Sequence, residues 1–153
     1  MIRFEASIMI ERPVVNVFEF VADGENGSKW NSAVLDVKKI SEGPVGVGTQ
    51  YWMARQLGNR RVENSYEVIE FEPNKKLSIK TRSGPTPFEY RYVFEGVEKR
   101  TSLSLVAEAE KEGLVDVLGV KARIAPEPVL ASFLKRRVEA NFRTLKNLLE
   151  HNI

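Results

Sequence analysis

The residue types that most often carry out chemistry in proteins are scarce in this sequence. It has 153 residues, no cysteine and a single histidine, His151. Without cysteine there is no thiol nucleophile and no thiolate ligand for a metal ion. A Ser-His-Asp triad would have to use His151, and a side chain so close to the end of the sequence is not held firmly enough for proton transfer. We therefore expect no metal site, no cofactor and no catalysis by an imidazole.

Residues that share one face of the predicted strands could instead form the wall of a binding cavity. Successive side chains of a strand point to opposite faces, so residues two apart lie on the same face. This alternation predicts the following inward-facing residues: Tyr51, Met53, Asn64, Tyr66, Ile79, Phe88, Tyr90 and Tyr92. A tyrosine offers an apolar ring that ends in a hydroxyl, which suits a mostly hydrophobic guest. The alternative is that the tyrosines fill a solid core and bond to the backbone.

Two polar residues interrupt the apolar face of a predicted C-terminal helix. Asn141 falls in the middle of that face and Arg137 lies near its edge, one turn away, while Phe133 is one turn further toward the N-terminus. A polar group in such a place must meet a partner, a water molecule or a ligand. We therefore add Arg137 and Asn141 to the predicted ligand-binding residues, together with Phe133, which lies across from the inward-facing strand residues. No residue is singled out as catalytic, although a tyrosine or a carboxylate in an apolar cavity could act as a general acid or base.

The helix that carries these three residues is predicted from Pro126 to Glu150. Its apolar residues recur at intervals of three and four, and they are Leu130, Phe133, Leu134, Val138, Leu145, Leu148 and Leu149. At 1.5 Å per residue the helix would be roughly 37 Å long, so it needs a wide surface to pack on. We expect Leu134, Leu145 and Leu148 to be among its most buried residues.

The sequence before this helix reads mainly as β-strands. Alternating or β-prone segments predict seven strands, at residues 3–11, 34–40, 49–56, 61–72, 76–82, 88–95 and 101–109. Two short helices, near residues 14–21 and 26–31, follow the first strand. Residues 113–125 are left open between a helix and a lid, because Pro126 and Pro128 would break a helix that continued through them. The sequence predicts one α+β domain spanning residues 1–153, with an antiparallel sheet curved around the long helix.

Composition and charge narrow the classes of partner. The net charge is +2, from 23 basic and 21 acidic residues that are scattered along the chain, so nucleic-acid binding has weak support. No apolar run approaches the ~20 residues of a membrane span, and the first residues do not resemble a signal peptide. The glycine-rich segment from Gly43 to Gly48 lacks the spacing of a phosphate-binding loop. We expect a cytoplasmic protein without stable membrane insertion.

Several segments, taken together with the order of elements, resemble a known group of proteins. They are Arg12-Pro13-Val14, Val17-Phe18, Ala22-Asp23, Trp30, the run from Pro44 to Thr49, the run from Tyr66 to Pro73, Ser83-Gly84-Pro85, and the run from Leu145 to Glu150. The chain is similar to the START-like helix-grip superfamily (SRPBCC), in its polyketide cyclase/dehydrase and lipid-transport branch. The resemblance implies a seven-stranded sheet that grips the C-terminal helix, with a mostly apolar cavity between them. It implies no catalytic motif, so the function has to be argued from the cavity wall.

Three functions remain open at this point. The first is binding or transport of a small hydrophobic molecule, which could be lipid-like, polyketide or aromatic. The second is a cyclase/dehydrase type of enzyme, in which a tyrosine or Arg137 polarises a carbonyl of such a molecule. The third is an interaction domain or homodimer whose cavity is vestigial. A catalyst should hold a group with a strongly shifted pKa in the cavity, whereas a carrier needs only shape and a few polar anchors.

Overall fold

The order of helices and strands agrees with the sequence prediction. A computed structural model describes residues 1–112 and 123–151, so most of the segment 113–125 lies outside the described residues. The elements are β1 (Ile2–Ile10), α1 (Val14–Ala22), η1 (Gly24–Asn26), α2 (Gly27–Trp30), β2 (Val34–Lys39), β3 (Gln50–Leu57), β4 (Arg60–Glu72), β5 (Lys76–Ser83), β6 (Phe88–Val97), β7 (Arg100–Ala109) and α5 (Glu127–His151). The predicted bounds differ from these by at most two residues.

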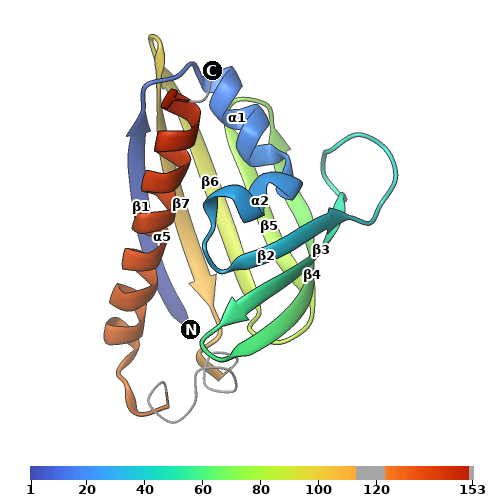
Figure 1. Ribbon diagram of the computed structural model, residues 1–153, viewed down its shortest axis with the longest axis vertical. Helices are drawn as coiled ribbons and strands as arrows, with labels where there is room; N and C mark the ends of the chain where they lie inside the picture. The colour runs from blue at the N-terminus through green and yellow to red at the C-terminus, as the bar shows by residue number, and fades with distance from the viewer. Residues whose placement is uncertain (113–122, 152–153) are drawn as a thin grey trace.

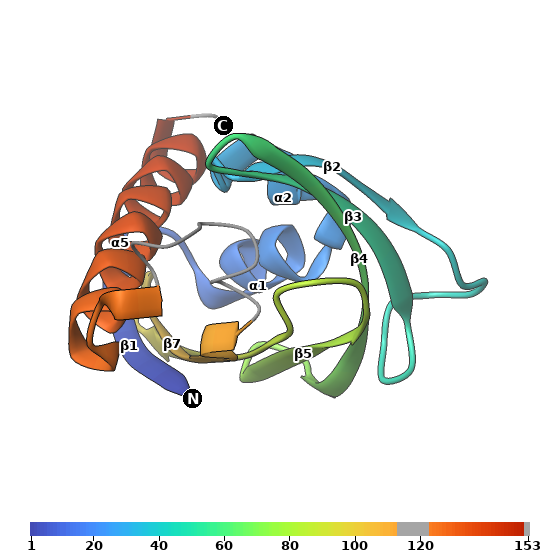
Figure 2. The same cartoon turned by 90° about the horizontal axis from the view of Figure 1, so that it is seen from below.

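The strands form one antiparallel sheet in the order β1-β7-β6-β5-β4-β3-β2. Breaks in register at Val34/Asp36, Ser65/Tyr66 and Val68/Glu70 increase the local twist and bend of β2 and β4. The sheet therefore curls, and the view from below shows it wrapping around an interior (Figure 2). The connection between β3 and β4 is a two-residue hairpin turn, and Gly58 occupies the left-handed region there with φ 59°.

Helix α5 closes the open side of the curled sheet. It lies along the edge strand β1 and reaches α2, which leads into the opposite edge strand β2 (Figures 1 and 2). At the other side, α1 packs Phe18 edge-on against Phe71 of β4 and Phe94 of β6. The core thus lies in a space with the sheet on most sides, α5 on one side and α1 across one end.

The burial of α5 differs in part from the prediction. Leu145 is completely buried, as expected, but Leu134 and Leu148 are only half-buried. The prediction was wrong for Leu134, which packs against the core but also borders the cavity, and for Leu148, which lies in the last turn of the helix. Phe142, which the pattern of leucines did not include, is 1% exposed and packs near Trp30, with ring centroids 6.3 Å apart.

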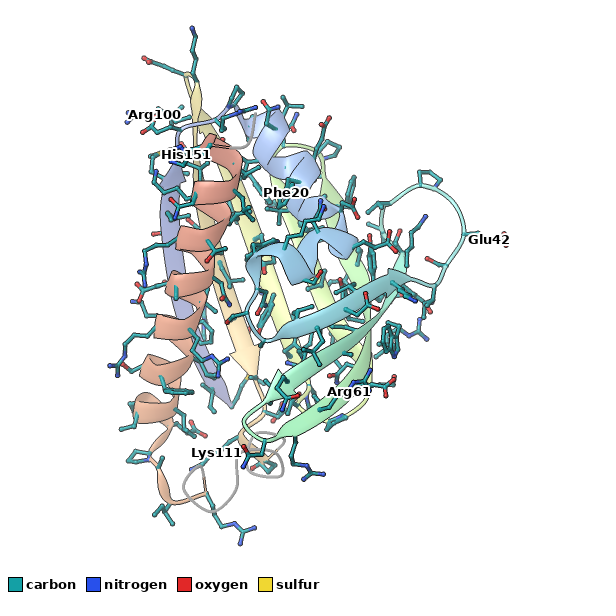
Figure 3. All side chains as sticks on the ribbon, viewed as in Figure 1. Phe20, Glu42, Arg61, Arg100, Lys111 and His151 are labelled. Carbon is teal, nitrogen blue, oxygen red and sulfur yellow. The ribbon has the colours of Figure 1, made fainter. Side chains whose placement is uncertain are left out.

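The single histidine lies at one end of the molecule, away from Lys111 (Figure 3). His151 is exposed at the C-terminal end of α5, at the same end of the molecule as Arg100, whereas Lys111 lies at the opposite end (Figure 3). The absence of a catalytic role for His151 stays a prediction, and its position at the tip of the helix supports it. None of the helices in the described ranges combines the length and the apolar character that a membrane crossing needs.

Candidate ligand-binding cavity

An internal cavity lies between the concave face of the sheet, α5 and the short helices. Its volume is about 160 Å³, and an apolar protein cavity of roughly 150 Å³ is large enough to admit benzene. Most of its wall is apolar or aromatic, and the aliphatic part includes Val21, Val34, Val37, Val68, Leu77 and Val138. The cavity can therefore receive a small, mostly hydrophobic molecule.

Nearly all of the predicted site residues line this cavity. They are Tyr51, Met53, Tyr66, Ile79, Phe88, Tyr90, Tyr92, Phe133, Arg137 and Asn141. Asn64 does not line it, and this is a correction. Its side chain is 2% exposed and its amide is used inside the wall, where the oxygen accepts a hydrogen bond from Arg55 and the nitrogen donates to the carbonyl oxygens of Ser83 and Pro85. The role of the lining residues as ligand contacts stays a prediction.

Tyr51 and Tyr66 form a stacked pair on neighbouring strands. Their ring centroids are 5.1 Å apart, and the residues face each other across the β3–β4 register. Gly24 of η1 closes over them, because a methyl group at this position would come within 2.6 Å of the Tyr66 hydroxyl and 2.8 Å of the Tyr51 ring. The backbone N–H of Gly24 donates a hydrogen bond to the Tyr51 hydroxyl oxygen at 3.4 Å. A glycine is needed here so that η1 can approach the two rings.

The other three tyrosine hydroxyls are not used in this way. Within the part of the chain that the structure describes, no hydrogen bond involves the hydroxyl of Tyr66, Tyr90 or Tyr92. Burial raises the pKa of all three side chains, because the phenolate would lose its solvation. The hydroxyls therefore stay neutral at neutral pH, and each can donate one hydrogen bond to a guest.

The most polar group in the wall is Arg55 of β3, which the sequence analysis did not select. Its side chain is 9% exposed, and its guanidinium carbon lies 5.2 Å from the centroid of the Phe88 ring. Nη2 donates to Asn64 Oδ1 at 2.7 Å and to both the hydroxyl and the carbonyl oxygen of Thr86. Burial lowers the pKa of Arg55, but arginine remains protonated in proteins. The cavity wall thus contains a buried cation.

The loop between β5 and β6 holds this arginine in place. Gly84 has φ 96°, and a methyl group there would come within 2.3 Å of the carbonyl oxygen of Glu63 on β4. Only a residue without a side chain lets the loop lie this close to β4. Thr86 then turns inward and is 4% exposed, so that its hydroxyl reaches Arg55.

On the helix side, the two polar residues have different surroundings. The Asn141 oxygen accepts hydrogen bonds from the backbone N–H and the hydroxyl of Ser32, both at 3.2 Å, and its nitrogen donates to Asn31 Oδ1 at 3.2 Å. Asn141 thus ties α5 to the segment that follows α2. The guanidinium of Arg137 lies 5.9 Å from the Phe133 ring centroid, and Phe133 is 47% exposed. This pair belongs to the outer part of the cavity wall.

Sequence reasoning could have found Arg55 but not its partner. Arg55 continues the alternation of Tyr51 and Met53, so its parity already predicts an inward side chain. Charged residues of a strand usually face solvent, and this expectation outweighed the parity of Arg55. Thr86 lies in a loop, where no periodicity exists to place it.

The charged residues of the wall are all of one sign. Among the described residues that line the cavity, Arg55 and Arg137 are charged, and no aspartate or glutamate is present. No cluster of three or more potential metal ligands was found in the described part of the chain. The cavity therefore combines hydrophobic walls, neutral hydroxyl donors and positive charge.

The comparisons with known proteins agree with this architecture. A family model described as "Polyketide cyclase / dehydrase and lipid transport" matches residues 1–150. A START superfamily protein from Mycobacterium smegmatis has a similar structure, with a TM-score of 0.81, 13% identity and 100% of each chain covered. The Zhui aromatase/cyclase from Streptomyces sp. R1128 gives a TM-score of 0.75 at 14% identity, over 97% of this chain and 93% of that one.

A third similar structure is a protein from Thermus thermophilus, with a TM-score of 0.74 and 15% identity over 97% of each chain. No curated protein matches the sequence at a significant level. At these identities the structural likeness shows the helix-grip fold, seven strands around a long helix, and nothing about the ligand.

Proposed function

The chain belongs to the polyketide cyclase/dehydrase and lipid transport family, and from this premise we propose that it binds a small hydrophobic molecule in the cavity between the sheet and α5. The observation that carries the proposal is the wall itself. It is mostly apolar, yet the hydroxyls of Tyr66, Tyr90 and Tyr92 have no hydrogen-bond partner in the described part of the chain. A solid core would give buried hydroxyls a partner, so these groups fit contact with a guest.

The first test fills the cavity. Ile79 of β5 lines it, so Ile79→Trp should occupy much of the space. We expect the wild type to enhance the fluorescence of N-phenyl-1-naphthylamine, a neutral hydrophobic probe, and the variant to lose this effect. The matched control is Ile69→Trp, because Ile69 of β4 is 39% exposed and does not line the cavity. Thermal unfolding of each variant shows whether it folds, and Ile79→Phe serves if Ile79→Trp does not.

Unchanged probe binding in a folded Ile79→Trp variant would place the site elsewhere. Native mass spectrometry of the freshly purified protein complements the titration, because a co-purified guest appears as an added mass. That mass should be absent from Ile79→Trp and retained in Ile69→Trp.

A second candidate function is catalysis of the cyclase type, and one observation favours it. The Arg55 guanidinium faces the same cavity as the Tyr90 hydroxyl, and the charge of Arg55 acts on Tyr90. Two such donors could bond to the oxygen of a guest ketone and stabilise the alkoxide that develops there when an enol carbon of the same molecule adds to the carbonyl carbon. The proton that the enol loses ends on that oxygen, so the product is a cyclic β-hydroxy ketone. Incubation with a linear poly-β-ketone thioester and mass analysis of the products would test this, with Arg55→Gln as the inactive variant. If no cyclised product forms above the uncatalysed level, the catalytic function is rejected and the binding function still stands.

A further inference from the structure

The charge of Arg55 has no countercharge in the described structure. The side chain is 9% exposed, and its nearest acceptors are the neutral oxygens of Asn64 and Thr86. None of the ion pairs formed by residues 1–112 and 123–151 includes it. Its Nε is also buried and has no hydrogen-bond acceptor within these residues. Within the described residues, this buried cation therefore lacks a hydrogen-bond acceptor for Nε and has no opposite charge to pair with.

Electrostatic energy favours an anion at this place. Burying a charge costs desolvation free energy unless an opposite charge pairs with it. A buried charge whose partner has been removed carries this cost in full. Neutral oxygens offset only a part of it. A carboxylate matches a guanidinium in shape as well as charge, because two parallel N–H groups can bond to its two oxygens. Nε is one of the donors that such an arrangement uses, and it is the one left free.

The remaining groups of the wall fit the same guest. Tyr90 and Arg55 line the same cavity beside Phe88, whose ring centroid lies 4.7 Å from that of Tyr90 and 5.2 Å from the Arg55 guanidinium carbon. Burial keeps the proton on Tyr90 by raising its pKa, so its hydroxyl can donate to an anionic oxygen. Arg137 is the only other charged residue among the described lining residues, and it is also a cation. The side chains of Asp23, the N-cap of η1, and of Glu25 are the nearest acidic groups that act on Tyr51 and Tyr66, but both residues are exposed and do not line the cavity. No described acidic side chain in the wall opposes a negative guest.

We propose that the guest is an organic acid, an apolar molecule whose carboxylate pairs with Arg55 while its hydrocarbon part fills the cavity. This inference rests on the proposed binding function and adds a class of ligand to it. The competing explanation is structural, because Arg55 also anchors the β5–β6 loop through Thr86. A purely structural arginine would give the cavity no preference between an acid and a neutral molecule of the same shape.

The experiment compares acids with their amides, which have nearly the same shape but no charge. Calorimetric titrations at pH 7.5 use 2-naphthoate against 2-naphthamide and decanoate against decanamide, with the refolded, ligand-free protein. We expect the acid of at least one pair to bind the wild type at least tenfold more tightly than its amide. In Arg55→Gln we expect the acid and the amide to bind with the same affinity. The control is Arg61→Gln on β4. Its side chain projects from the surface (Figure 3) and pairs with Glu63, so the substitution should leave the preference unchanged.

Each outcome has a defined meaning. Equal binding of acid and amide to the wild type overturns the acid proposal and leaves the hydrophobic binding function standing. An acid preference that survives in Arg55→Gln also overturns it, because another cation then carries the preference. Failure of all four compounds and of N-phenyl-1-naphthylamine to bind overturns both the proposal and the proposed function.

A second measurement keeps the test decisive if Arg55→Gln does not fold. In the ¹⁵N-labelled wild type, the acid should shift the Nε–H signal of Arg55, because the carboxylate becomes the acceptor that Nε lacks. The amide should shift it less. An unmoved signal at saturating acid overturns the pairing with Arg55. The signal is assigned with Arg55→Lys, which removes Nε and keeps the charge.

Discussion

Burial gives the tyrosines of the cavity a specific chemical role. It raises the pKa of Tyr51, Tyr66, Tyr90 and Tyr92, since a buried phenolate loses its solvation. A tyrosine with a raised pKa is a poor base at neutral pH, but it keeps a proton to donate. These residues therefore suit recognition of an oxygen atom better than proton abstraction.

The Tyr66 hydroxyl provides a direct test of this role. Because it has no partner in the described residues, we expect Tyr66→Phe to leave the melting temperature unchanged or slightly higher. Affinity for an oxygen-bearing guest should fall by about 1 kcal/mol, or roughly fivefold. The matched control is Tyr51→Phe, which removes the acceptor of the Gly24 N–H and should cost about 1 kcal/mol of stability. Thermal unfolding and titration with 2-naphthoate separate the two effects, and a destabilised Tyr66→Phe would contradict the idea of a free hydroxyl.

Asn141 is both a candidate ligand contact and a structural tie. Since its amide bonds to Asn31 and Ser32, Asn141→Leu should leave those groups without a partner. We expect a loss of about 1–3 kcal/mol in the free energy of unfolding. Chemical denaturation measures it, with Arg137→Met as the control that removes a polar lining residue without breaking hydrogen bonds of the described chain. A variant as stable as the wild type would show that these bonds contribute little.

At the scale of elements, the sequence determined the fold well because periodicity and turns are local signals. Alternation in residues 3–11 and 101–109 placed two strands, and the three- and four-residue spacing after Pro126 placed α5. Contacts between distant segments leave no such signal. The loop that buries Thr86 against Arg55 depends on Gly84 lying against β4, and the pairing of Phe142 with Trp30 depends on how α5 crosses α2. The sequence therefore predicted ten of the lining residues, Arg137 among them, but missed the buried cation Arg55.

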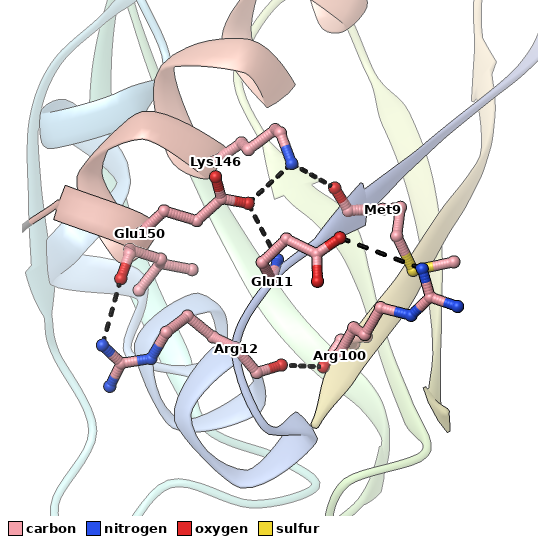
Figure 4. A network of polar contacts seen from close by, with 8 residues as sticks. Met9, Glu11, Arg12, Arg100, Lys146 and Glu150 are labelled. Atoms are coloured by element: carbon pink, nitrogen blue, oxygen red, sulfur yellow. Dashed lines mark hydrogen bonds and ion pairs between the residues drawn. The ribbon is translucent and has the colours of Figure 1, made fainter. Parts of the chain in front are cut away.

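The C-terminal end of α5 is joined to the start of the chain by a polar network (Figure 4). Glu150 accepts hydrogen bonds from the Glu11 backbone N–H at 2.8 Å and from Lys146 at 2.6 Å, and Lys146 also donates to the Met9 carbonyl. Arg12 donates to the Leu149 carbonyl at 3.3 Å. The network closes the last turn of α5 onto the connection between β1 and α1, and its residues do not line the cavity.

The charge of Glu150 should make this closure dependent on pH. Burial alone would raise the pKa of Glu150, but the bonds from Glu11 and Lys146 outweigh it and lower the pKa below 4.5. A lowered folded-state pKa means that the stabilisation is complete above the unfolded value and is lost as the pH falls through the folded value. We expect Glu150→Gln to cost about 1 kcal/mol at pH 7 and progressively less as the pH falls from the unfolded value through the lower folded-state pKa of Glu150.

Denaturation curves from pH 7 to pH 3 measure this difference. The control is Glu42→Gln, since Glu42 projects from the loop between β2 and β3 (Figure 3). A cost for Glu150→Gln that stays constant down to pH 3 would show that the carboxylate charge is not what holds the helix end.

At the scale of the whole molecule, the fold leaves its centre incompletely filled. One sheet curls through seven strands and a long helix closes it, so no second sheet fills the concave face among residues 1–112 and 123–151. Side chains from β3 to β6 reach inward from one side and those of α5 from the other, and about 160 Å³ stays open between them. Dense packing is the rule in protein interiors, so an unfilled centre of this size makes the stability of the protein depend on what occupies it.

This dependence gives the last prediction. A guest that binds only the folded state at 100 times its dissociation constant adds about 2.7 kcal/mol of stability. For a domain of this size, that corresponds to a rise of about 5–10 °C in melting temperature. We expect saturating 2-naphthoate to raise the melting temperature of the refolded wild type by this amount and to leave Ile79→Trp unchanged. Filling the cavity with a side chain should by itself remove the response, whereas Ile69→Trp should respond as the wild type does. An equal rise in Ile79→Trp would mean that the compound stabilises the protein from a different site, and the unfilled centre would then have no part in binding.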